Sequence, residues 1–86
     1  MNFVDVAISR EHRFSIGRET ETGRCYIAIP VANRLVDYEE YFEISLDVLA
    51  DYPRNISELI ALAGKCRAHL CDHLLLVRPG ADRGVG

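Results

Sequence analysis

The sequence predicts an α+β fold: an antiparallel β-meander of three to five strands, with one long and one short helix packed on one face. Three observations lead to this prediction. The first half of the chain alternates apolar and polar residues in short runs separated by turn residues, as half-buried strands do. Residues 56–70 repeat apolar side chains at helical spacing. A length of 86 residues is sufficient for one hydrophobic core and too short for two.

Three strands are predicted in the first part of the chain, over residues 3–8, 13–19 and 24–31. The first strand places three apolar residues on one side: Val4, Val6 and Ile8. The second and third strands form a hairpin if Ile16 pairs with Ile27, because residues 20–23 are then a four-residue loop that ends in glycine. This register also gives two further matched pairs, Phe14 with Ile29 and Glu19 with Arg24.

The stretch RLVDYEEYFEIS, residues 34–45, predicts a fourth strand with two different faces. A two-residue turn at Asn33-Arg34 pairs Ile27 with Glu40 and sets the register of the whole strand. The other pairs in this register are Val31 with Val36, Ile29 with Tyr38, Cys25 with Phe42, Ala28 with Glu39, Tyr26 with Tyr41 and Arg24 with Glu43. The strand therefore directs one set of side chains to the helices and the other set to solvent.

Two helices follow the strands. Ser45 is a suitable N-cap for a short helix that ends by Pro53. Asn55 with Glu58 three residues later resembles a capping box, which predicts the start of a longer helix. Residues 74–77, LLLV, predict a short buried strand, with the end of the long helix as the alternative. We therefore expect a single domain over residues 1–78 and a flexible C-terminal tail over residues 79–86.

Composition excludes several classes of protein. The chain is 49% hydrophobic and 27% charged, as soluble globular domains are, and it has no apolar run near the roughly 18–20 residues that span a membrane. The first twelve residues lack the basic and apolar segments of a signal peptide. The three cysteines are scattered rather than arranged as a disulfide framework. We expect a cytoplasmic protein that does not associate with membranes.

The charge distribution indicates the kind of partner. The net charge is −3, and residues 35–52 hold six acidic groups and no basic group. A protein that binds nucleic acid through its backbone phosphates would carry a basic stripe instead. The acidic segment disfavours DNA and RNA and favours a protein partner with a basic surface.

The solvent-facing side of the predicted sheet is the candidate binding surface. Its candidate partner-binding residues are Tyr26, Asp37, Glu39, Tyr41 and Glu43. Tyrosine offers a large contact area at low entropic cost, and carboxylates steer a basic partner. Gly17, opposite Tyr26, leaves room for the two tyrosines to lie over the backbone. The alternative interpretation is a solvated face whose charges are partly cancelled by Arg24.

Glu40 is the candidate buried polar residue, because it falls on the apolar face of the fourth strand. A carboxylate there requires a partner or a bulge that turns it outward, and a general acid is the third alternative. Arg18, across Cys25 on the same face, is the candidate partner, and Arg67 or His69 of the long helix are others.

No motif in the sequence indicates catalysis or metal binding. Cys66, His69 and His73 share one helical stripe, and cysteine and histidine are zinc ligands, but no CxxC or HExxH pattern accompanies them. A nucleophile with a histidine in reach is not required by any spacing, and no glycine-rich loop opens a helix. We expect no enzymatic activity, no cofactor and no metal.

The run GRETETGRCYIAIPVANRLVDYEEYFEIS, residues 17–45, resembles a pattern in a family of small uncharacterised bacterial proteins. The shared features are glycine-arginine, a Thr-Gly turn, an apolar strand into IPV, an asparagine turn and DYEEY. The resemblance covers about a third of the chain and implies no activity. By analogy, the resemblance implies a small cytoplasmic immunity or accessory protein.

The function predicted from the sequence is a small non-enzymatic protein-binding module, of the kind represented by immunity-type or antitoxin-like inhibitors of a basic partner. The alternative is a small-molecule-binding or catalytic domain with a site between sheet and helix around Glu40. A homodimer joined through an exposed strand edge is the third hypothesis.

Overall fold

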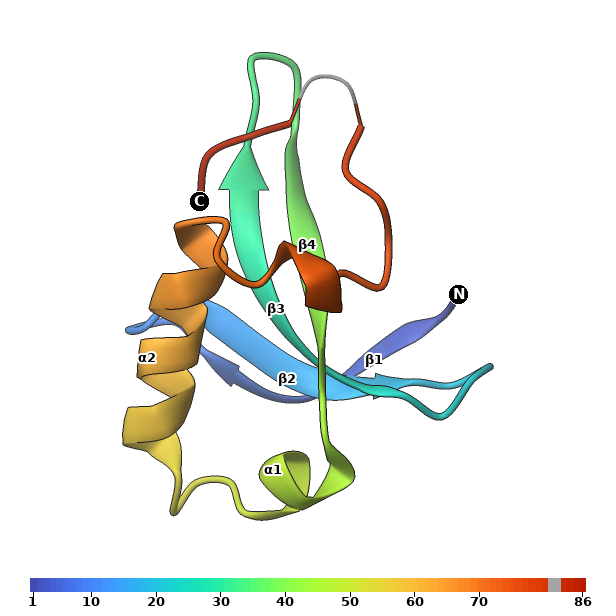
Figure 1. Cartoon of the computed structure of the whole chain (residues 1–86), viewed down its shortest axis with the longest axis vertical. Helices are drawn as coiled ribbons and strands as arrows, with labels where there is room; N and C mark the ends of the chain where they lie inside the picture. Colours follow the sequence, from blue (N-terminus) through green and yellow to red (C-terminus); the bar gives the residue numbers. More distant parts are fainter. Residues whose placement is uncertain (81–82) are drawn as a thin grey trace.

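The computed structural model describes residues 1–80 and 83–86 and has the predicted α+β architecture. A four-stranded antiparallel sheet has the order β1-β2-β3-β4, so each strand lies beside its neighbour in the sequence (Figure 1). The strands are β1 (Phe3–Ser9), β2 (Phe14–Glu19), β3 (Cys25–Ala32) and β4 (Asp37–Ile44). The helices are α1 (Leu46–Ala50), α2 (Ile56–Arg67) and the single 3-10 turn η1 (Asp72–Leu74). Within the described residues no helix is long and apolar enough to cross a membrane.

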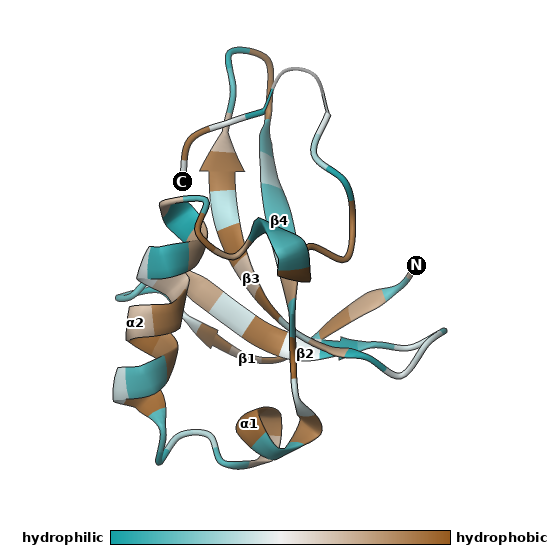
Figure 2. Ribbon diagram, viewed as in Figure 1, coloured by the Kyte–Doolittle hydropathy of each residue, from teal (hydrophilic) through white to brown (hydrophobic). Residues whose placement is uncertain are grey.

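The hydrophobic core lies between one face of the sheet and the two α-helices. Alternate residues of β2, β3 and β4 supply the sheet side of the core, and Leu49 of α1 with Leu59, Ala63 and Cys66 of α2 supply the helix side. Figure 2 shows the apolar bands of β2 and β3 beside α2, whose own polar and apolar bands alternate. The apolar residues that alternate along the strands with a period of 2 therefore pack against the apolar residues that recur every 3.6 positions along the helices, in one core.

The β2–β3 hairpin has the predicted register. Ile16 pairs with Ile27, and Gly17 pairs with Tyr26. The loop over residues 20–23 is closed by hydrogen bonds from Glu19 N to Arg24 O and from Gly23 N to Glu19 O, and Gly23 has a φ of 74°. A glycine at the end of this loop is required because the left-handed region strains other residues.

The predicted register of β3 and β4 is wrong by two residues. Ile27 pairs with Phe42 and Ile29 with Glu40, whereas the sequence predicted Ile27 opposite Glu40. The cause is the turn: Asn33 Oδ1 accepts hydrogen bonds from both Leu35 N and Val36 N at 2.8 Å, and Asn33 N donates to Val36 O. This side-chain turn makes the loop two residues longer than the predicted Asn33-Arg34 turn. Because strand side chains alternate with a period of two, the faces are unchanged.

The first strand departs from simple alternation. A β-bulge lies between Asp5 and Ala7, where the register against β2 shifts by one residue. The predicted apolar side of β1 does not join the core, because Val4, Val6 and Ile8 are 48%, 64% and 60% exposed. The small Ala7 contacts the core instead.

The helix caps are only partly as predicted. Ser45 caps α1, with its Oγ accepting from Val48 N at 3.1 Å. Asn55 precedes α2 but forms no capping box; its amide donates instead to Val48 O at 2.9 Å, which ties α2 to α1. The amide of Asn55 is therefore used in a tertiary contact rather than in the first turn of its own helix.

The described parts of the C-terminal segment contact both strands of the β3–β4 hairpin, β4 through Leu75 and β3 through Val85 (Figure 1). Residues 74–77 are not a strand; Leu75 forms a single bridge with Phe42, and Leu76 N donates to Tyr41 O. Val85 and Ala32 form an antiparallel bridge, in which the backbone N–H of each residue donates to the carbonyl oxygen of the other. The flexibility expected of residues 79–86 remains a prediction, and residues 81–82 lie outside the described residues. Residues 83–86, however, are in contact with the sheet.

Candidate functional site

The face of the sheet opposite α1 and α2 carries most of the predicted binding residues, and we call it the helix-free face. Its residues are Phe3, Asp5, Ile8, Ser15, Gly17, Tyr26, Ala28, Pro30, Asp37, Glu39, Tyr41 and Glu43. Asp37, Glu39 and Glu43 are exposed there, as the sequence predicted, while Tyr41 is half-buried. These three exposed acidic residues come from β4, and β1 adds a fourth, Asp5.

Three aromatic rings pack together on this face. The ring of Phe3 stacks on Tyr41 with centroids 3.7 Å apart, and Tyr26 meets both rings edge-on at 5.3 and 5.1 Å. Tyr26 is fully buried, and its hydroxyl donates to Asp5 Oδ1 at 2.6 Å. The prediction that Tyr26 is a partner contact is therefore wrong, because β1 folds over it. Phe3 was not identified from the sequence, since its neighbours in space come from other strands.

Gly17 makes this packing possible. A Cβ atom at Gly17 would overlap the carbonyl oxygen of Val4 and lie 2.6 Å from the hydroxyl of Tyr26. The prediction that this glycine leaves room for a tyrosine over the backbone is confirmed for Tyr26. The glycine thereby sets the position of the Tyr26 hydroxyl, which in turn holds Asp5.

The negative charge of Asp5 acts on the ionisation of Glu39, its neighbour on this face. Burial raises the pKa of Glu39, the negative charge of Asp5 raises it further, and a hydrogen bond from Ser15 lowers it. Burial also raises the pKa of the Tyr41 phenol, with the charges of Glu39 and Asp5 adding to the effect. Glu43, in contrast, has a basic neighbour: Arg24 Nε lies 3.9 Å from its Oε2, as the sequence predicted. The face is therefore negative near Asp5 and Glu39 and partly neutralised near Glu43.

A shallow cleft of about 390 Å³ opens beside these carboxylates. It lies where the turn between β1 and β2 meets the middle of β3 and β4. Its lining residues are Asp5, Ile8, Ser9, Arg10, Arg13, Phe14, Ser15, Ala28, Pro30 and Glu39. The floor is largely apolar, and the rim carries charges of both signs. The four charged side chains are Asp5, Arg10, Arg13 and Glu39. Within residues 1–80 and 83–86 none of them forms an ion pair.

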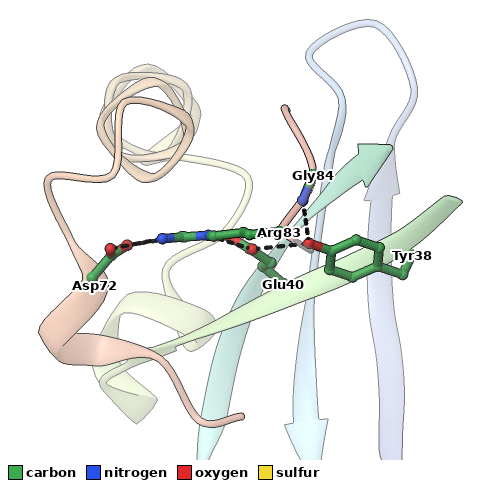
Figure 3. A network of polar contacts seen from close by, with 5 residues as sticks. All are labelled: Tyr38, Glu40, Asp72, Arg83 and Gly84. Carbon is green, nitrogen blue, oxygen red and sulfur yellow. Dashed lines mark hydrogen bonds and ion pairs between the residues drawn. The ribbon is translucent and has the colours of Figure 1, made fainter. Parts of the chain in front are cut away.

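Glu40 is buried as predicted, but its partner is a residue that the sequence did not indicate. Arg83 donates to both carboxylate oxygens of Glu40 at 2.8 Å, from Nε and Nη2 (Figure 3). The same guanidinium donates to both oxygens of Asp72, at 2.8 and 2.9 Å. Figure 3 shows Arg83 between the two carboxylates, with Tyr38 beside Glu40. The phenol oxygen of Tyr38 accepts from Gly84 N at 2.6 Å, so the C-terminal segment closes over Glu40.

The predicted partner, Arg18, is not near Glu40. Arg18 is exposed, pairs with Cys25 and donates to Gly23 O at 3.3 Å, at the opposite end of β3 from Glu40. The two-residue error in register accounts for this, because it moved Glu40 toward Cys25. The hydrogen bonds from Arg83 lower the pKa of Asp72, and the two carboxylates raise the pKa of Arg83. The geometry is that of a fully paired structural network.

Glu19, at the end of β2, is a second buried carboxylate; the sequence predicted its pairing with Arg24 across the hairpin but not its burial. Its oxygens accept from the hydroxyl and amide of Thr22 at 2.6 and 2.8 Å, and from Asn2 N and Glu21 N, both at 2.9 Å. These hydrogen bonds lower the pKa of Glu19 to about 2, and the bond from the Thr22 hydroxyl makes the largest contribution. Glu19 therefore organises the β2–β3 turn and fixes the start of β1 to it.

The predicted stripe of Cys66, His69 and His73 does not form. The helix α2 ends at Arg67, and His69 has a φ of 62°, so the two histidines leave the helical surface. Across residues 1–80 and 83–86, no group of three or more His, Cys, Asp or Glu side chains is arranged to hold a metal ion. Burial raises the pKa of the Cys66 thiol to about 12, and Cys71 adds to this, which disfavours the thiolate that a nucleophile or ligand requires.

Comparison with protein-family models, with curated proteins and with solved structures gave no significant match to this chain.

Proposed function

We propose that this chain is a small non-enzymatic protein-binding module whose helix-free face binds a protein with a basic surface. The observation that supports the proposal is the arrangement of Asp5, Asp37 and Glu39. These three exposed carboxylates share one face and make no ion pair within the described residues. Negative charge that is left uncompensated on one face steers a basic partner and disfavours an acidic one.

The half-buried Tyr41 supplies the second element of a binding surface. Its ring is held in one position by Phe3 and Tyr26, so contact with a partner costs little conformational entropy. Tyrosine is enriched among the residues that contribute most to binding at protein interfaces, and carboxylates beside it steer a basic partner. Within this class we propose an immunity-type or antitoxin-like inhibitor of a basic protein, in the cytoplasm.

The experiment that tests this proposal is capture of partners from the native cell with purified protein. We compare the wild type with Glu39→Lys and with Tyr41→Phe, which removes the hydroxyl while keeping the stacked ring. The matched control is Glu58→Lys, an exposed acidic residue on α2. A basic protein retained by the wild type and by Glu58→Lys, and lost from Glu39→Lys, supports the proposal. A partner retained equally by all variants removes this face from consideration.

The cleft beside Glu39 favours a second candidate function, the binding of a small molecule. Its volume of about 390 Å³ falls within the range of ligand pockets, and its apolar floor with a few polar groups is of the usual kind. The predicted site around Glu40 supports this less, because both oxygens of Glu40 bind Arg83. Ligand titration followed by amide NMR shifts tests it: shifts at Ser15 and Ala28 with none at Gly64 favour binding in the cleft, and the absence of any shift contradicts it.

A further inference from the structure

The cleft beside Glu39 carries its charges in two separate groups. The acidic group is Asp5 of β1 with Glu39 of β4, and the basic group is Arg10 with Arg13 in the turn between β1 and β2. No ion pair joins the two groups within residues 1–80 and 83–86. Because two negative and two positive side chains line it, the cleft has no net charge and disfavours a ligand whose charges are all of one sign.

The two carboxylates are held in place by hydroxyl groups of the sheet. Asp5 Oδ1 accepts from the Tyr26 hydroxyl at 2.6 Å, and Glu39 accepts a hydrogen bond from the side chain of Ser15. Burial raises the pKa of Glu39, and the charge of Asp5 raises it further, so the two carboxylates repel each other. An ammonium group between them relieves this repulsion and has three N–H donors to share.

The basic turn is fixed by a side chain of α2. Arg67 Nη2 donates to the carbonyl oxygen of His12 at 2.9 Å and to that of Arg13. Arg13 has a φ of 57°, in the left-handed region that glycine adopts at lower cost. The chain therefore keeps a cationic side chain where the backbone favours glycine. Burial lowers the pKa of Arg67, and the positive charge of Arg13 lowers it further, so positive charge accumulates at this end of the cleft.

The spacing of the two groups limits the length of a ligand that reaches both. Arg13 precedes Ser15, the hydrogen-bond partner of Glu39, by two residues, so their Cα atoms are at most about 7 Å apart. An extended dipeptide has about the same length. The cleft volume of about 390 Å³ is near the lower end of the range for ligand pockets, which suits a ligand of this size. Ala28 and Pro30 belong to the apolar part of the lining and suit an apolar body.

We propose that the cleft binds a small zwitterion with an apolar body, of the class represented by a free dipeptide of apolar residues. Its ammonium group lies between Asp5 and Glu39, and its carboxylate accepts hydrogen bonds from Arg13, with Arg10 adding positive charge. The proposal rests on the second candidate function, ligand binding in the cleft, and names the chemical class of that ligand. It is independent of the binding of a basic protein by the helix-free face.

Dipeptides with free and blocked ends test the proposal. Amide NMR shifts of the full chain measure the binding of leucyl-alanine and of alanyl-phenylalanine. For ligands of this size we expect a dissociation constant of about 1 mM, with shifts at Ser15 and Ala28 and none at Gly64. Acetylation of the amine removes the cation, and amidation of the carboxylate removes the anion. We expect each change to weaken binding by about tenfold.

Two variants assign the ends of the ligand. Arg13→Gly removes the guanidinium and keeps the turn, because glycine adopts the left-handed conformation without strain. We expect it to bind the free dipeptides about tenfold more weakly and to lose the preference for free over amidated forms. Glu39→Gln weakens binding as well and reduces the effect of acetylation instead. The matched controls are Arg34→Gln and Glu58→Gln, exposed residues outside the cleft, which bind as the wild type does.

Three results overturn the proposal. The first is the absence of shifts at Ser15 and Ala28 with both free dipeptides at about 10 mM, even if an uncharged compound produces them. The second is equal binding of free and blocked dipeptides, which leaves the small-molecule function standing because the cleft then binds an apolar body without recognising its charges. The third is an amidation effect that is the same in Arg13→Gly as in the wild type.

Discussion

Arg83 donates hydrogen bonds to both carboxylate oxygens of Glu40 at 2.8 Å, and the two residues lie 43 positions apart in the sequence. Glu40 is only 5% exposed, so Arg83 is the group that compensates its charge in the core. The same contact attaches the end of the chain to the outer strand of the sheet. Arg83 is therefore a residue of the folded domain, and we expect its removal to affect the stability of the whole protein.

We expect Arg83→Ala to lower the free energy of unfolding by about 3 kcal/mol, because a buried carboxylate is left without its partner. Urea unfolding monitored by circular dichroism measures the loss. Arg78→Ala, an exposed arginine in the same C-terminal segment, is the control and changes the value by less than about 0.5 kcal/mol. Equal stability of the two variants would show that Glu40 does not depend on Arg83.

We expect Gly17→Ala to destabilise the protein by about 3 kcal/mol, because the added Cβ overlaps the backbone of β1 and presses on Tyr26. Gly64→Ala in α2 is the matched control, since nothing lies within 4 Å of its added Cβ. That substitution raises stability by about 0.5–1 kcal/mol through helix propensity. Thermal melting of both variants checks the opposite signs, and a Gly17→Ala protein as stable as wild type would contradict the close packing of β1.

The C-terminal closure can be tested with a second pair of glycines. A Cβ at Gly84 would lie 2.5 Å from Ala32 O, whereas nothing lies within 4 Å of one at Gly80. We expect Gly84→Ala to cost about 1–3 kcal/mol and to speed amide hydrogen exchange at Ala32, whose N–H donates to Val85. Gly80→Ala leaves both measurements near wild type. If residues 79–86 are flexible throughout, as their sequence predicted, the two variants behave alike.

Glu19 gives a prediction about pH. Its folded pKa of about 2 lies below the ordinary value of 4.5, so the stability it contributes is fully present above pH 4.5 and is lost as the pH falls toward 2. We expect Glu19→Gln to be less stable than wild type at pH 7, with the difference shrinking between pH 4.5 and 2. Glu11→Gln, whose side chain is 86% exposed, is the control. Parallel stability curves for wild type and Glu19→Gln across this range would contradict the assignment.

The four strands, the two helices and the faces of β2, β3 and β4 were predictable because they depend on local patterns, whereas the apolar side of β1 and the strand expected over residues 74–77 were predicted wrongly. Alternation over a few residues predicted the strands, a glycine-ended loop set the β2–β3 register, and Ser45 capped α1 as expected. The β3–β4 register was predicted two residues away from its position, because the Asn33 side-chain turn and a two-residue turn are both compatible with the local sequence. The faces were still correct, since an error of two residues preserves alternation.

The sequence by itself determined the fold class, the strand order, the side of β4 that carries Asp37, Glu39 and Glu43, and the burial of Glu40. These features follow from periodicity and turn chemistry, which act between residues that are close along the chain. Only the tertiary structure decided that β1 covers Tyr26 and that Arg83 pairs with Glu40. Both contacts join residues more than twenty positions apart, and their formation depends on how the bulged β1 and the C-terminal segment pass over the finished sheet. No local sequence pattern encodes these two contacts, because they stabilise the protein only when the sheet has already formed.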